Sequence, residues 1–174
     1  MRGVAGPPYL KAVVGVSPLM DLAASSAALH EPQNRLYASR FLSEELKRFR
    51  RKIELYPGLY TANGLGKIRT VRQFDEQVVA RYGGFRGADD YYCRVASSNW
   101  AQDIAVPTLI LQALDDPFIR MTPDTHAKLV ANPRLMLVET RHGGHCAFLS
   151  LEPGDAGYWA ERTLLDFLLA TVEG

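Results

Sequence analysis

Strands that alternate with helices constrain the fold of this sequence more than any other feature. Runs rich in apolar and β-branched residues, typical of buried strands, occupy 9–17 (YLKAVVGVS), 107–113 (PTLILQA) and 135–140 (LMLVET). Thr122 followed by Pro123 marks the start of a helix between the second and third runs. A helical pattern over 158–172 follows, and its expected buried side carries Trp159, Leu164, Leu165, Leu168 and Leu169. Because alternating strands and helices form parallel sheets, the sequence predicts an α/β fold of about three parallel strands with flanking helices.

The segment between the first two runs is long and helical in pattern. Over 34–56 the apolar residues recur near the helical period, and Pro57-Gly58 ends the pattern. Thr70 is typical of an N-cap and opens a second helix, and 88–96 predicts a third. We therefore expect one partial domain over 1–174 with a helical cap inserted within it at about 22–98.

Charge and hydropathy narrow the classes of function. The net charge of +1 provides no strong field for nucleic acid, and the basic run at 47–52 is typical of a solvated helix face. No apolar run approaches the roughly 20 residues of a membrane span, and the first eight residues lack a signal peptide's apolar core. Two distant cysteines, Cys93 and Cys146, indicate free thiols in a reducing compartment. We expect a cytoplasmic protein that spans no membrane and binds no nucleic acid.

Acidic and imidazole side chains follow the second and third predicted strands. The segment DDPF (115–118) comes shortly after 107–113, and HGGH (142–145) comes shortly after 135–140. The carboxyl ends of parallel strands meet at one edge of a sheet, so an Asp and a His from these segments can pair. A carboxylate that orients an imidazole forms the acid and base of a catalytic triad, and Asp before His matches the chain order in α/β-hydrolases.

Two plainer interpretations compete with this one. An Asp-Asp-Pro segment after a strand is often only a turn, because Asp and Pro are common turn formers. His142 and His145 could also ligate a metal, but we find no third ligand beyond Asp115 or Asp116. The joint pattern favours the acid and base, so we expect no metal and no cofactor.

A serine hydrolase also needs a nucleophile, and the sequence contains no G-x-S-x-G motif. The nearest match, GVSPL at 15–19, lacks the second glycine, and Pro18 has no N–H to donate to an oxyanion. Cys146 adjoins the expected base rather than facing it. The sequence therefore predicts an acid and a base without a nucleophile.

Four short motifs carry a family resemblance: FD at 74–75, DDYY at 89–92, DDPF at 115–118 and HGGH at 142–145. With these motifs, nearly the whole chain resembles the C-terminal half of the YheT-like esterase family of α/β-hydrolases. The resemblance implies a carboxylesterase or acylglycerol lipase that acts on short- to medium-chain acyl esters. It also implies that Asp116 is the acid and His145 the base, whereas Asp115 and His142 are their neighbours. The family's nucleophile elbow would lie just upstream of the first strand.

Three hypotheses follow from an acid and base without a nucleophile. The chain is a truncated esterase that is inactive alone, or half of a split esterase that an N-terminal chain completes, or a non-catalytic binding module. The expected partner is a small acyl ester once the nucleophile is supplied. The first strand lacks the neighbour that would lead to the elbow, so we expect its edge over 10–17 to bind an N-terminal fragment or to self-associate.

Overall fold

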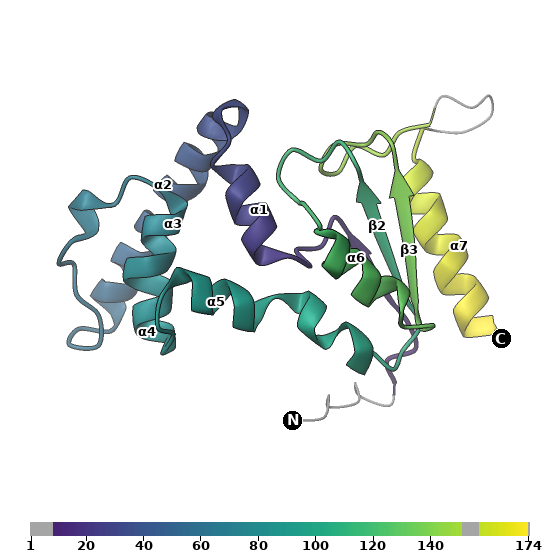
Figure 1. The fold of residues 1–174 in the computed structure, drawn as a ribbon, viewed down its shortest axis with the longest axis horizontal. Helices are drawn as coiled ribbons and strands as arrows, with labels where there is room; N and C mark the ends of the chain where they lie inside the picture. Colours follow the sequence, from purple (N-terminus) through teal and green to yellow (C-terminus); the bar gives the residue numbers. More distant parts are fainter. Residues whose placement is uncertain (1–8, 151–156, 174) are drawn as a thin grey trace. The chain divides into compact units, whose positions relative to one another are not determined.

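The computed structural model describes residues 9–150 and 157–173. It confirms the α/β class, because a parallel sheet in the order β1 (Val13–Val16), β2 (Thr108–Ala113) and β3 (Leu135–Thr140) is flanked by helices (Figure 1). All six residues of β2 are buried, as expected for a strand with a neighbour on each side. In the register, Val13 lies opposite Thr108, and Thr108 opposite Leu135. The arrangement is consistent with part of an α/β-hydrolase fold.

Strand β1 is shorter than the apolar run that predicts it. Its first ladder bond joins the Val13 amide to the Pro107 carbonyl oxygen at 3.0 Å, and β2 itself begins one residue later. Residues 9–12 therefore have no strand beside them, and the side chain of Tyr9 is exposed. The partner strand, rather than β propensity, sets where β1 begins.

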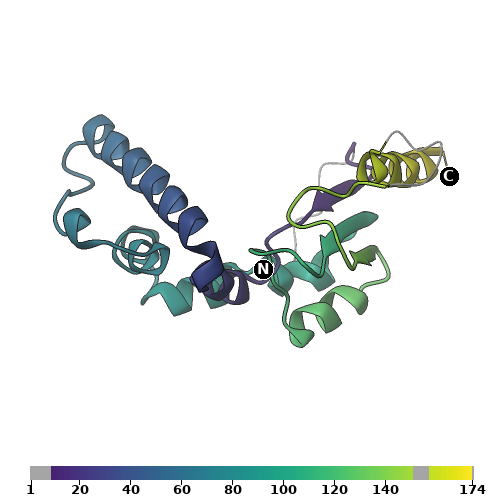
Figure 2. The same cartoon turned by 90° about the horizontal axis from the view of Figure 1, so that it is seen from above.

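Helices cover both faces of the sheet. Leu109 and Leu111 of β2 pack on one face with Ala160 of α7 (Trp159–Glu173). Ile110 points the other way and packs with Leu129 of α6 (Pro123–Val130). Figure 2 shows α6 and α7 on opposite sides of the sheet. Alternation along one strand thus builds two apolar layers, and burial of each large side chain contributes roughly 1.5–3 kcal/mol.

The buried side of α7 differs in part from the predicted one. Trp159, Leu164 and Phe167 pack against the core, but Leu165 and Leu169 are exposed. The prediction for these two leucines is therefore wrong for the described residues. Leu165 and Leu169 lie one helical turn apart and about 100° around the axis from Leu164 and Leu168, outside the strip that faces β1 and β2.

A second compact unit, Ser26–Val95, is helical. Its helices are α1 (Leu22–Leu29), which enters from the sheet unit, α2 (Arg35–Leu55), α3 (Val71–Phe74), η3 (Asp75–Ala80), α4 (Arg81–Gly83) and α5 (Ala88–Val95), with 3₁₀ turns η1 (Pro32–Asn34) and η2 (Leu65–Lys67). A further 3₁₀ segment, η4 (Ser97–Asp103), returns the chain to β2. The unit's core forms around Phe49, Phe74 and Val78. No helix of the described residues is both long and apolar enough to cross a membrane.

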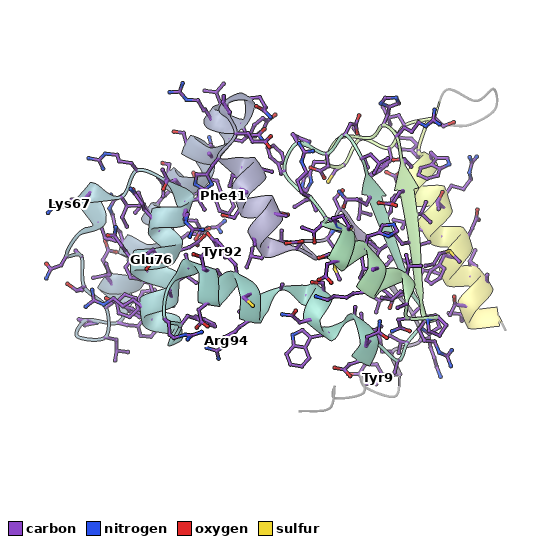
Figure 3. The ribbon with its side chains drawn as sticks, in the orientation of Figure 1. Tyr9, Phe41, Lys67, Glu76, Tyr92 and Arg94 are labelled. Carbon is purple, nitrogen blue, oxygen red and sulfur yellow. The ribbon has the colours of Figure 1, made fainter. Side chains whose placement is uncertain are left out.

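The predicted N-cap at Thr70 is confirmed, because its side chain accepts a hydrogen bond from the Gln73 amide at 3.1 Å. The helix that follows passes into one π-helical segment, η3, which the sequence pattern did not indicate. There Asp75 accepts a hydrogen bond from the Tyr92 hydroxyl at 2.5 Å, and Glu76 accepts one from the Ala88 amide at 2.6 Å. Figure 3 shows Tyr92 and Glu76 among the helices of this unit. Burial raises the pKa of both Asp75 and Tyr92.

Candidate active site

Asp116 lies in the turn that follows β2, and its side chain is fully buried. Its amide donates to the Ala113 carbonyl oxygen at 3.3 Å, which turns the chain back on itself. Its Oδ1 atom accepts hydrogen bonds from the amides of Phe118 at 2.8 Å and Ile119 at 2.9 Å. A carboxylate often folds back on the next residues in this way. The turn therefore fixes one carboxylate oxygen and leaves the other, Oδ2, for a partner.

That partner is His145, whose Nδ1 lies 3.0 Å from Asp116 Oδ2. The separation is within hydrogen-bond reach, as the positions at neighbouring strand ends predict. The Phe118 ring stands nearly perpendicular to the imidazole, with the ring centres 5.6 Å apart. When Nδ1 carries the proton that it donates to Asp116, the neutral ring has its lone pair on Nε2. An imidazole in this tautomer can accept a proton from a nucleophile.

Asp115 and His142 form a second, more exposed pair. Asp115 Oδ2 lies 3.3 Å from His142 Nδ1, and Asp115 Oδ1 accepts a hydrogen bond from the Gly144 amide at 2.8 Å. The Gly144 hydrogen bond, with a smaller contribution from His142, lowers the pKa of Asp115. The structure therefore joins each aspartate to a different histidine, and it does not bring all four side chains into one cluster.

The loop that carries His145 favours glycine at two positions, at Gly143 for lack of space and at Gly144 for the backbone conformation. A Cβ atom on Gly143 would lie 2.6 Å from the ring of Phe148 and 3.2 Å from Ala113 Cβ. Gly144 has a φ of +54°, in the left-handed region that L-residues rarely adopt. The two glycines let the backbone leave β3 and turn His145 towards Asp116.

Ser17 directly follows β1, and in the sequence it is only a poor match to a nucleophile motif. The structure places its Oγ atom 2.6 Å from the carbonyl oxygen of His145, to which it donates. The hydroxyl is thus engaged with the backbone of the loop. Ser17 is buried and has a φ of +45°, which is uncommon for a residue other than glycine. In the sequence, Pro18 indicated only that no N–H follows Ser17 for an oxyanion, and it did not indicate this contact.

Asp21 is a second residue whose contacts the sequence did not indicate. It accepts hydrogen bonds from the Ala24 amide at 3.1 Å, from the Thr122 hydroxyl at 2.8 Å and from the Thr125 hydroxyl at 2.9 Å. Burial raises the pKa of Asp21, but these hydrogen bonds outweigh it and lower the pKa overall. Thr122 also caps α6, as predicted, by accepting from the Thr125 amide. Asp21 therefore joins the start of α1 to the start of α6. It does not contact Asp116 or His145 through any of these hydrogen bonds.

The remaining sequence candidates do not join this site. Cys93 and Cys146 are exposed and are not joined in a disulfide. Within residues 9–150 and 157–173, no three His, Cys, Asp or Glu side chains gather in an arrangement that could hold a metal ion. The described strand ends thus carry two carboxylate–imidazole pairs, and only the pair of Asp116 and His145 has a buried carboxylate.

No protein-family model matches this chain. It is 33% identical over 171 residues to "Putative esterase YheT" of Escherichia coli (strain K12), which covers 95% of the chain and 49% of that protein. It is 30% identical over 181 residues to "Phospholipase ABHD3" of Mus musculus, with 95% of the chain and 43% of that protein covered. "Monoacylglycerol lipase" of Saccharomyces cerevisiae is 34% identical over 104 residues, which cover 60% of the chain and 22% of that protein. The chain spans about half, or less, of the length of these curated relatives.

Proposed function

Because this chain belongs to the YheT-like esterase family of α/β-hydrolases and corresponds to the C-terminal part of its relatives, we propose that Asp116 and His145 are the acid and base of a serine carboxylic-ester hydrolase. The observation that carries the proposal is the 3.0 Å contact between His145 Nδ1 and Asp116 Oδ2. Asp116 is fully buried, so its carboxylate is held in one place. The relatives' names, an esterase, a phospholipase and a monoacylglycerol lipase, support an ester as the substrate.

In the proposed reaction, a serine from polypeptide outside these 174 residues attacks the ester carbonyl carbon. His145 Nε2 takes the serine proton during the attack and then gives it to the oxygen of the leaving alcohol, as the bond between that oxygen and the carbonyl carbon breaks. His145 next takes a proton from water, which attacks the acyl-enzyme, and returns it to the serine as the carboxylic acid leaves. Asp116 keeps the ring in the required tautomer and stabilises its charged form.

Two surfaces of the described residues support a nucleophile-bearing N-terminal half as the partner. In the described sheet β1 is an edge strand, so one side of its backbone has no strand beside it. On α7, Leu165, Leu169 and Val172 form an exposed apolar stripe with helical spacing. A strand beside β1 would pair its open edge, and a further packed element would cover the stripe on α7. We expect slower hydrogen exchange at β1 once that half is present.

A chimera tests the proposal directly. The part of Escherichia coli YheT that precedes the matching region is fused to this chain, and hydrolysis of p-nitrophenyl butyrate is measured. We expect the chimera to hydrolyse this ester, and His145→Ala to lower its rate by a factor of about 10⁴ or more. The 174 residues alone should show no hydrolysis above the rate in buffer.

His126→Ala is the matched control, because His126 is a half-exposed histidine of α6 that pairs with Glu139. It should keep the activity of the parent chimera. Turnover that survives in His145→Ala would contradict the proposal, and so would a folded, monodisperse chimera with no turnover.

A further inference from the structure

The loop that carries His145 is tied to the ends of two other strands. From β1, the Ser17 hydroxyl donates to the carbonyl oxygen of His145 at 2.6 Å. From the turn after β2, Asp115 Oδ1 accepts the Gly144 amide at 2.8 Å. Neither contact involves the imidazole. The Ser17 contact holds the peptide group that follows His145, and the Asp115 contact holds the Gly143–Gly144 peptide group, which lies one residue before His145.

The Asp115 contact is a hydrogen bond to a charged acceptor. Its carboxyl keeps a lowered pKa, chiefly through the Gly144 hydrogen bond and then through His142, so it is ionised at neutral pH. A bond from an amide to an ionised carboxylate is stronger than one between neutral groups. Gly143 and Gly144 are otherwise the most permissive part of the backbone in this loop. Asp115 therefore restrains the backbone of the loop at its two glycines, where the residue types themselves restrict the backbone least.

The Ser17 contact is made from an uncommon backbone conformation. Ser17 has a φ of +45°, and its amide donates to the Leu111 carbonyl oxygen at 2.7 Å. A residue that keeps a left-handed conformation without being glycine is held there by its surroundings, and such positions gather at functional sites. Here the backbone is fixed by β2 and the hydroxyl reaches the loop after β3. All three strand ends thus meet at His145.

We propose that Ser17 and Asp115 are positioning residues, which together clamp the backbone on both sides of His145 so that Nδ1 stays on Asp116. The catalytic meaning of this clamp rests on the proposed function. The His145 side chain is only about half buried, and a shift of about 1 Å in a catalytic group can lower a rate about 10²-fold. Burial of Asp116 alone therefore does not hold the imidazole; the backbone clamp supplies the second restraint.

Exchange of the His145 Nδ1 proton with solvent reports on the clamp without any need for activity. In the 174-residue chain, NMR at low temperature should show this proton as a downfield, slowly exchanging resonance, and Asp116→Asn should abolish it. We expect Ser17→Ala and Asp115→Ala each to speed its exchange by about tenfold or more. Asp115→Asn keeps a carbonyl oxygen for the Gly144 amide, so it should restore most of the protection.

Further variants separate the clamp from general effects on folding. Ser17→Gly suits the left-handed backbone better than serine does, yet it lacks the hydroxyl, so it should also speed exchange. Ser25→Ala is the matched buried serine, since Ser25 bonds to the Arg120 backbone, and Asp124→Ala is a matched exposed carboxylate on α6. Both should leave the exchange rate within about twofold of the parent.

The outcomes distinguish the clamp from the function on which it rests. If Asp116→Asn abolishes the resonance but Ser17→Gly and Asp115→Ala leave its exchange unchanged, the clamp is wrong and the acid–base pair stands. If the parent chain shows no protected Nδ1 proton, the pair itself is not formed and both proposals fail.

In the chimera, the clamp further predicts a fall in kcat of about tenfold for Ser17→Gly with KM unchanged. An equal change in KM would instead indicate a role in substrate binding.

Discussion

Two neighbouring aspartates pair with two neighbouring histidines in this protein, and the pairs differ mainly in burial. Asp116 is 0% exposed and lies 3.0 Å from His145, whose side chain is 44% exposed. Asp115 is 43% exposed and lies 3.3 Å from His142, which is 88% exposed. The same chemical groups thus form one pair whose carboxylate is shielded from water and one pair in which both side chains are exposed to it. Because screening weakens an exposed contact, the comparison indicates that only the buried pair can hold an imidazole for catalysis.

The largest expected difference between the pairs lies in catalysis by the chimera. In Asp116→Asn an amide NH₂ can donate to His145 Nδ1, so the proton of the neutral imidazole lies on Nε2. Nε2 then has no lone pair with which to accept the serine proton. We expect kcat to fall by about 10⁴ in Asp116→Asn and by less than about tenfold in Asp115→Asn. Steady-state kinetics on p-nitrophenyl butyrate measure both. Equal losses in the two variants would mean that burial does not separate the pairs.

A smaller difference is expected in the free energy of unfolding. Asp116→Ala removes the buried carboxylate that accepts from the amides of Phe118 and Ile119 in a partly buried turn, which costs roughly 2–4 kcal/mol. Asp115→Ala exposes its former partner, the Gly144 amide, to water, so its effect should be much smaller. Urea unfolding of the 174-residue chain, followed by circular dichroism, measures the two values. A larger loss for Asp115→Ala would reverse the comparison.

A smaller difference in the free energy of unfolding is expected between substitutions of the two loop glycines. Gly143→Ala forces a Cβ atom against Phe148 and Ala113 in the core, and such overpacking costs roughly 1–3 kcal/mol. Gly144→Ala has open space but a left-handed backbone, so it should cost about 1–2 kcal/mol. The same urea titrations apply. Only Gly143→Ala should also shift the NMR signals of Phe148. Unchanged Phe148 signals in Gly143→Ala would contradict the close approach of Gly143 to this ring.

The smallest effect concerns the titration of Asp115. Its pKa is lowered chiefly by the Gly144 amide and less by His142, so in His142→Ala it should still lie below its usual value of 3.8. Because the folded-state pKa is depressed, the stability that this group contributes is present above the unfolded-state pKa and is lost as pH falls through the folded-state pKa. Carbon NMR of the Asp115 carboxyl between pH 2 and 6 follows the titration. A return to 3.8 in His142→Ala would make the histidine the main cause.

Local elements were predictable because each depends on residues that lie close together in the chain. Thr122 and Thr70 cap helices as predicted, and the predicted strand over 135–140 has the bounds that the structure shows. The strand-end pattern also brought an aspartate and a histidine to one edge of the sheet. It could not choose between Asp115 and Asp116. The family motif pointed to Asp116, and the structure places that residue beside His145.

Contacts between distant segments were decided by the tertiary structure alone. The length of β1 depends on where β2 begins, and the buried strip of α7 depends on the strands beneath it. Ser17 and His145 are 128 residues apart, and no local pattern marks their hydrogen bond.

The sequence by itself therefore determined the α/β class, most of the helices and the segments that carry the paired aspartates and histidines, because spacing and caps are properties of neighbouring residues. Only the tertiary structure decided which carboxylate is buried and which strand ends hold the imidazole. Burial and long-range hydrogen bonds exist only once separate segments have packed together.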